Sequence, residues 1–339
     1  MRFLVHGRGL AAALTIDALV SEGVAPEEIW TTGTLAPPAG SLAPAALLNP
    51  LTGRSLKPPI EGPGVFRAAQ KTWSRLKDRY PQLVSSVIVH RPFISGHKLF
   101  EKLERTFTEH QQELVQGWDV REPSPKELSQ LRATTVSNCT GAMTIDGAFA
   151  VQLPQFLEAF WSELTKLGVK VAQESLDAEI TIRCDGAALR ENLPSSIRLE
   201  PLGGELFEVS PIHTLEAGHA LAGDGHYIRI NDQRAIVGST YHRHGQPLVD
   251  APWTHLNRRL ESWLPSLEGP PKSSWYGERL IVPDDRKPIV GATSQNDSTY
   301  LCTGFASKGL YWAPFATHAL ARHILFRESL PDAISIARF

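Results

Sequence analysis

Apolar residues along the chain recur with two different periods, and these predict short buried strands and amphipathic helices. The chain opens with an apolar run at 3–5, followed by two glycines and an apolar stretch of helical period at 13–20. A second strand-like run, 29–32, follows a polar loop at 21–28. Strand, tight glycine turn, helix and strand in this order are typical of an α/β unit with parallel strands.

The middle of the chain mixes both patterns. A strand is expected at 87–89, a helix at 98–115, and an amphipathic helix at 153–167, where Phe156, Phe160 and Leu164 recur at helical spacing. The stretch 35–63 is rich in Pro, Ala and Gly, which predicts a loop with short helical turns. Further strands are expected at 168–171, 178–184 and 299–303 and between 206 and 237, with turns at 223–225 and 231–232, and a closing helix is expected at 313–326.

Strands thus alternate with helices at both ends of the chain, and β-rich segments lie between them. This order predicts the α/β class, with a Rossmann-type nucleotide-binding domain assembled from discontinuous pieces. We expect residues 1–80, 140–195 and 276–339 to form that domain. Residues 81–139 and 196–275 would form an inserted, β-rich (α+β) substrate-binding domain.

Composition narrows the class of protein. The chain has 339 residues, 42% hydrophobic and 21% charged, with a net charge of −2, which gives no electrostatic reason to expect a nucleic-acid partner. Its three cysteines, Cys139, Cys184 and Cys302, are far apart and are expected to be buried apolar residues rather than a disulfide or zinc site. No apolar run suits a signal peptide or a membrane span, so a cytoplasmic protein without a membrane partner is expected. The oligomeric state is not indicated.

Gly7 and Gly9 with Ala12 form the pattern G-x-G-x-x-A between the first strand and its helix. The first glycine permits a sharp turn, the second lets a pyrophosphate approach the backbone, and the small Ala12 allows close helix–strand packing. The helix N-terminus supplies amide donors and a favourable dipole for the phosphates. This context predicts dinucleotide binding.

The second strand lacks one expected group. Dinucleotide folds usually place Asp or Glu there, roughly 20 residues after the glycines, to hold the ribose hydroxyls. This strand ends in Thr31 and Thr32, whereas Glu27 and Glu28 lie at its start. A threonine hydroxyl offers a single neutral contact in place of a charged bidentate one.

Three further segments carry motifs: residues 41–54 (SLAPAALLNPLTGR), 285–291 (DRKPIVG) and 303–314 (TGFASKGLYWAP). Together they resemble segments of FAD-dependent oxidoreductases of the D-amino-acid oxidase and glycine oxidase type. Weaker matches at 147–151, 184–186 and 237–241 follow in the same order along the chain. In the family the first segment passes close to the flavin phosphates, and the last presents backbone N–H groups to the flavin's pyrimidine edge.

The resemblance implies FAD as the cofactor. With the glycine turn, it assigns FAD contacts to Gly7, Gly9, Leu10, Ala11, Ala12, Thr31, Thr32, Ser41, Ala46, Leu47, Leu48, Asn49, Gly186, Gly304, Ser307, Lys308, Gly309 and Leu310. A helix N-terminus and the nearby Lys308 would stabilise the negative charge of a reduced flavin.

Arg279 is the main candidate for substrate binding. Glycine oxidase-like enzymes carry Gly-x-Arg-Pro at this point, and their arginine binds the substrate carboxylate; here Leu280 stands where proline is usual. The further candidates for the substrate site are Arg286, His242, Tyr241 and Tyr311.

No acid–base residue is assigned. His90, His242 and His244 are candidates, although a single histidine is more often a structural hydrogen-bonding residue. The pattern His242-Arg243-His244 lacks cysteine or carboxylate partners at metal-ligand spacing, so no metal site is expected.

The leading hypothesis is an FAD-dependent oxidase or dehydrogenase that takes a hydride from a small amine or amino acid, with dioxygen or another acceptor reoxidising the flavin. The alternative is an accessory or binding protein of the same fold that has lost cofactor or activity, which Thr31, Thr32 and Leu280 favour. A nicotinamide-dependent dehydrogenase would explain only the first glycine turn.

Overall fold

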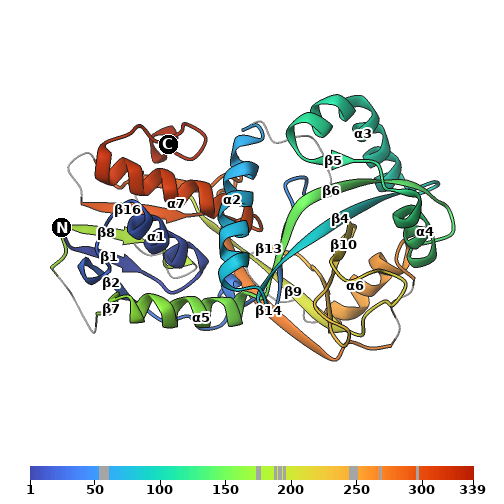
Figure 1. Ribbon diagram of the computed structural model, residues 1–339, viewed down its shortest axis with the longest axis horizontal. Coiled ribbons are helices and arrows are strands. Elements are labelled where there is room, and N and C mark those ends of the chain that lie inside the picture. Colours follow the sequence, from blue (N-terminus) through green and yellow to red (C-terminus); the bar gives the residue numbers. More distant parts are fainter. Residues whose placement is uncertain are drawn as a thin grey trace.

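The computed structural model describes residues 1–52, 61–172, 177–186, 189, 193, 196–243, 251–265, 267, 269–294 and 298–339. Within these residues, two β-sheets follow one another along the long axis of the molecule (Figure 1). Segments from both ends of the chain meet in the first sheet. The second sheet is formed mainly by the middle of the chain.

The first sheet has six strands in the described part of the chain, and all its pairs are parallel except β15–β16. Its central strand β1 is buried, which suits a continuous apolar run. In spatial order the strands are β15 (Ile289–Ala292), β16 (Thr299–Thr303), β8 (Ile180–Arg183), β1 (Phe3–His6), β2 (Ile29–Thr32) and β7 (Lys170–Val171).

Helices cover this sheet. Helix α1 (Leu10–Ser21) packs against α5 (Leu153–Lys166) and α7 (Gly309–Phe326), and α2 (Gly64–Arg79) packs against α7 (Figure 1). The small residues Ala12 and Ala13 of α1 are fully buried, which allows the close helix–strand contact expected of this motif.

The second sheet is mostly antiparallel and has ten strands among the described residues. Its path is β13 (His242–Arg243), β9 (Glu200–Val209), β12 (Ala235–Gly238), β11 (Gly225–Arg229), β10 (His219–Gly223), β4 (Val84–Ile94), β6 (Cys139–Val151) and β3 (Ala46–Leu48), with β14 (Ser273–Ile281) beside β9 and β5 (Val120–Arg121) beside β6. The helices α3 (Lys98–Gly117), α4 (Pro125–Thr134) and α6 (Pro252–Glu261) contact β4, β6 and β11 respectively.

The expected α/β class and its β-rich second layer are confirmed, as are the strands at 29–32 and 299–303 and the turn at 223–225. The division into domains stays a prediction, but the pairing shows two strands that cross its boundaries. Strand β6 and most of β14 belong to the second sheet, although residues 140–151 and 276–281 were expected in the nucleotide-binding domain. Within the expected loop 35–63, Ala46–Leu48 forms a strand because it pairs with the distant Phe149–Val151.

Candidate functional site

A cavity of about 670 Å³ lies where the two sheets meet. Its lining includes the Gly7–Ala11 turn, residues between 32 and 49, residues 184–186, the 302–310 turn before α7, and strands of the second sheet that carry Arg279 and His226. This volume falls within the range of roughly 300–1,000 Å³ that small-molecule and cofactor sites occupy. The cavity therefore brings both expected cofactor turns and the main substrate candidate together.

At Gly7 and Gly9, the turn after β1 has no room for a side chain. Gly7 adopts a φ of +104°, and a β-carbon there would lie 2.7 Å from the Cys184 carbonyl oxygen. A β-carbon at Gly9 would lie 2.9 Å from Ser41 Oγ, which accepts a hydrogen bond from the Leu10 amide at 3.1 Å. Bare backbone at the N-terminus of a 12-residue helix fits the pyrophosphate of FAD.

The two threonines at the end of β2 differ in orientation. Thr31 is 1% exposed, and its hydroxyl donates to the Gly7 carbonyl at 3.2 Å, which holds the glycine turn against β2. Thr32 instead lines the cavity. Glu28 lies at the other end of the strand, where it pairs with the N-terminal ammonium at 2.7 Å.

The turn before α7 provides a second set of backbone donors at the cavity. Gly304 and Ala306 have φ values of +77° and +51°, and α7 begins at Gly309. Lys308 occupies the N-cap position, with its ammonium nitrogen 5.9 Å from the centre of the Tyr311 ring. Burial lowers the pKa of Lys308 from its ordinary value. The N-terminus of an 18-residue helix thus reaches the cavity next to that of α1, since a β-carbon at Gly309 would lie 3.5 Å from Leu10 Cδ2.

Most of the residues expected to bind the cofactor line the cavity. Those that do not are Ala12, Thr31, Leu48 and Lys308. Those that do are Gly7, Gly9, Leu10, Ala11, Thr32, Ser41, Ala46, Leu47, Asn49, Gly186, Gly304, Ser307, Gly309 and Leu310. Gly53 and Arg54 of the segment 41–54 lie outside the described residues.

Arg279 on β14 extends into this cavity from the second sheet. Its Nε and Nη2 atoms are buried and have no hydrogen-bond partner among the described residues. The guanidinium carbon lies 5.1 Å from the centre of the Tyr241 ring, which also lines the cavity and is 58% exposed. A buried guanidinium with unpaired donors is costly on its own and well suited to a carboxylate ligand.

The other expected substrate residues lie outside the cavity lining. His242 is buried and is bound to Glu205, with Thr240 Oγ1 at 2.8 Å from its Nε2 atom. Tyr311 is 2% exposed, and its side chain is part of the core under α7. Arg286 has a φ of +58° in the turn before β15. His244 lies outside the described residues.

The cavity also contains groups that the sequence did not single out. Arg8 lies within the glycine turn and stacks 4.6 Å from the centre of the Trp161 ring, so it places a positive charge beside the expected phosphates. Its position between Gly7 and Gly9 could have identified Arg8 as a site residue from the sequence alone. His226, Trp275 and the ion pair of Arg259 with Asp224 (2.7 Å) come from segments without a motif, and only the folded sheet brings them to the cavity.

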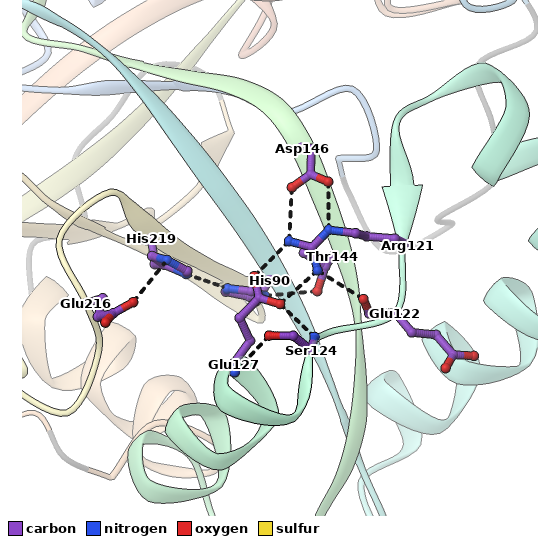
Figure 2. Close-up of polar contacts among 9 residues, drawn as sticks. All are labelled: His90, Arg121, Glu122, Ser124, Glu127, Thr144, Asp146, Glu216 and His219. Atoms are coloured by element: carbon purple, nitrogen blue, oxygen red, sulfur yellow. Dashed lines mark hydrogen bonds and ion pairs between the residues drawn. The ribbon is translucent and has the colours of Figure 1, made fainter.

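A second polar cluster lies in the second sheet, outside the cavity lining (Figure 2). His90 on β4, His219 on β10 and Glu127 on α4 bring potential metal-ligand atoms within 4.8 Å of one another. His90 Nε2 lies 2.8 Å from His219 Nδ1, and His90 Nδ1 lies 3.0 Å from Thr144 Oγ1.

The carboxylate of this cluster is already engaged. Arg121 donates to both Glu127 oxygens at 2.8 and 2.7 Å, and the Ser124 amide donates to one of them at 2.7 Å. The Arg121 guanidinium holds the pKa of Glu127 well below its usual range. Burial lowers the pKa of His90 to about 4, and burial also lowers that of His219. Two neutral imidazoles from β4 and β10, which share a hydrogen bond, therefore lie beside the ion pair of Arg121 with Glu127 of α4.

Comparison with solved structures shows the same fold. An iminodiacetate oxidase from a Chelativorans species has a TM-score of 0.79 at 16% identity, and the match covers 98% of this chain and 99% of that one. A glycine oxidase from Bacillus cereus has a TM-score of 0.76 at 16% identity, covering 97% and 96%. An L-amino acid deaminase from Proteus vulgaris has a TM-score of 0.75 at 12% identity, covering 100% and 97%. At these identities the likeness concerns the fold alone.

Comparison with curated proteins gives a partial match. The chain is 25% identical over 166 residues to the tRNA 5-methylaminomethyl-2-thiouridine biosynthesis bifunctional protein MnmC of Acinetobacter baylyi. The match covers 45% of this chain and only 26% of that protein's length. In the described part of the chain, no helix combines the length and the apolar character that crossing a membrane requires.

A family model settles the assignment. The model for FAD dependent oxidoreductases, DAO, matches residues 37–323, which is most of the chain. It includes the Ser41 segment, Arg279 and the turn before α7, all of which line the cavity. The chain therefore belongs to the DAO family of FAD-dependent oxidoreductases.

Proposed function

We propose that this protein oxidises a small amine that bears a carboxylate, such as an amino acid, and that dioxygen or another acceptor takes up the electrons. The observation that carries this proposal is Arg279, whose buried Nε and Nη2 have no partner among the described residues. A carboxylate ligand would supply both missing acceptors in one bidentate contact. The names of the iminodiacetate and glycine oxidases are consistent with small amino carboxylates as substrates.

Each part of the cavity has a role in this reaction. Gly7, Gly9 and the N-terminus of α1 would hold the pyrophosphate of FAD, and the turn before α7 would hold its ring system. Bound FAD supplies a ring that accepts a hydride equivalent. Arg279 would fix the substrate carboxylate and thereby the position of the carbon next to the nitrogen, which lowers the barrier by orientation.

The electrostatics favour reduction at the same place. The N-terminus of α7 carries a partial positive charge, and the half-buried Lys308 is its N-cap residue. Both would stabilise negative charge that develops on the pyrimidine edge of a reduced flavin.

Replacing Arg279 tests the proposal without requiring turnover. In FAD-loaded protein, Arg279→Ala should weaken binding of isobutyrate, a simple carboxylate, by roughly 10–100-fold, because a charge-assisted contact of about 1.5–3 kcal/mol is lost. Arg279→Lys keeps the charge but not the planar guanidinium, so its affinity for isobutyrate should lie between those of the parent and Arg279→Ala. Binding is measured by isothermal titration calorimetry and by the change in flavin absorbance.

The matched control is Arg105→Ala on the exposed side of α3, which should leave binding unchanged. The FAD content of all three variants should equal that of the parent. Unchanged isobutyrate affinity in Arg279→Ala would show that the guanidinium does not receive the carboxylate. Arg286 would then be tested, and a neutral amine would become the better substrate candidate.

A further inference from the structure

His226 lies on β11 and lines the same cavity as Arg279. Its strand neighbours are Ala222 on β10 and Gly238 on β12. A β-carbon at Gly238 would lie 3.2 Å from His226 Cε1 and 3.4 Å from Nε2. The missing side chain at Gly238 thus leaves space for the imidazole at the cavity wall.

The imidazole is the uncharged nitrogen base of this wall. None of the described residues forms a hydrogen bond with it. The charge of Arg279 on β14 acts on it, and the same cavity lining includes Glu278 on β14 and the pair formed by Asp224, in the β10–β11 turn, and Arg259 on α6. The Asp224 carboxylate is bound by the Arg259 guanidinium at 2.7 and 3.2 Å, which leaves His226 as a neutral group that can receive a proton.

The surroundings keep His226 neutral before substrate binds. Burial and, to a smaller extent, the charge of Arg279 lower the pKa of His226 to about 4. At pH 7 one ring nitrogen therefore carries a lone pair. A carboxylate bound to Arg279 would offset the guanidinium charge and raise the basicity of His226 at the moment the substrate arrives.

Oxidation of an amine requires such a group. An alkylammonium has a pKa of about 10, so at pH 7 only about one molecule in a thousand is the neutral amine. The carbon next to the nitrogen releases a hydride only when the nitrogen lone pair is free to form the new C=N bond. One proton must therefore leave the bound substrate before the hydride does.

We propose that His226 accepts this proton from the substrate ammonium group. The N–H bond breaks, its electron pair stays on the substrate nitrogen, and the proton bonds to the free ring nitrogen of His226. Bound FAD would supply the hydride acceptor, and the lone pair of the neutral nitrogen would then be available for the second bond of C=N. This inference rests on the function proposed above and adds a catalytic base to it.

Two ligands that are not oxidised separate the roles of Arg279 and His226. Isobutyrate carries only the carboxylate, whereas 2-aminoisobutyrate adds an ammonium group on a carbon that has no hydrogen to lose. His226→Phe keeps a ring of similar shape and removes the acceptor. In FAD-loaded protein this variant should bind isobutyrate like the parent and bind 2-aminoisobutyrate roughly 10–100-fold more weakly, because a charge-assisted hydrogen bond is lost. The control is His213→Phe, at an exposed position outside the cavity lining, which should change neither affinity.

Each outcome of the binding experiment is decisive. Selective loss of 2-aminoisobutyrate supports the proposal, and retained isobutyrate binding shows that the variant is folded. No weakening of either ligand contradicts a contact between His226 and the ammonium group and leaves the carboxylate site intact. Equal weakening of both ligands also contradicts that contact, because the loss then lies in carboxylate binding. If the parent binds neither ligand, the proposed function itself fails, and the inference fails with it.

The pH dependence of kcat/KM gives a second readout with an oxidised amino acid. With a neutral His226 the parent accepts the ammonium form, so kcat/KM should stay nearly constant between about pH 6 and 9. The His226→Phe variant can oxidise only the neutral amine form of the substrate. Its kcat/KM should therefore rise about tenfold per pH unit and approach that of the parent near pH 10. A loss of equal size at every pH would indicate a structural role and contradict the proposal.

Discussion

At the scale of single residues, the end of β2 lacks the acidic side chain that dinucleotide-binding folds usually place there. The two threonines there are adjacent in sequence, yet Thr31 is bound to the Gly7 carbonyl and Thr32 lines the cavity. Their orientations follow from the alternation of side chains along a strand. The sequence shows that an acidic residue is missing. Only the structure shows that Thr32, rather than Thr31, is the position from which an acidic side chain would face the cavity.

Thr32→Glu should therefore tighten FAD binding, because a carboxylate there could accept hydrogen bonds from both ribose hydroxyls. Such a contact is worth about 1.5–3 kcal/mol before desolvation is subtracted, so the rate of FAD dissociation should fall. Thr31→Glu serves as the comparison, since it buries a charge at a position 1% exposed and should lower the melting temperature instead. Dissociation rates that are the same in the parent and Thr32→Glu would mean that another group already holds the ribose.

At the scale of secondary-structure elements, strands and helices with strong periodicity were predictable, and elements defined by distant partners were not. Helix α5 and strand β2 follow their apolar patterns closely. Strand β3 consists of three residues in a Pro- and Ala-rich stretch and exists because β6 pairs with it. No local pattern contains that information, because a strand three residues long has no period to detect.

The cluster around His90, which brings together side chains of β4, β10 and α4, predicts how the stability of the protein depends on pH (Figure 2). The pKa of His90 is lowered to about 4 in the folded protein, against about 6.5 when unfolded. The unfolded chain therefore binds the proton first as the pH falls. The contribution of the neutral His90 to the free energy of unfolding is complete above about pH 6.5. It is lost as the pH falls towards 4, with an upper limit of about 3 kcal/mol.

Urea unfolding at pH 7 and pH 5 measures this effect. His90→Gln removes the titrating ring, so the loss of stability between the two pH values should be smaller than in the parent. His213→Gln, at an exposed position, should retain the full pH dependence. If His90→Gln and the parent lost the same free energy of unfolding between pH 7 and pH 5, the His90 imidazole would not be the group that titrates.

At the scale of the whole molecule, the site exists because the two sheets meet. The segments around Gly7, Ser41 and Ser307 carry family motifs, so the part of the cavity that they line could be predicted from sequence. The part lined by the second sheet was predicted only at Arg279 and Tyr241, because His226 and Arg259 lie in segments whose sequence carries no motif. Conversely, His242 was expected in the site, but its buried contact with Glu205 keeps it in the second sheet.

The most direct test of this account is anaerobic titration of the FAD-loaded protein with a panel of small amino acids and N-alkyl amino acids, followed by flavin absorbance. The account predicts that at least one carboxylate-bearing amine bleaches the flavin, that the colour returns when dioxygen or another acceptor is admitted, and that the Arg279→Ala protein bleaches far more slowly. A flavin that dithionite reduces but no amine does would contradict amine oxidation, and a protein that takes up no FAD at all would favour an accessory role for this fold.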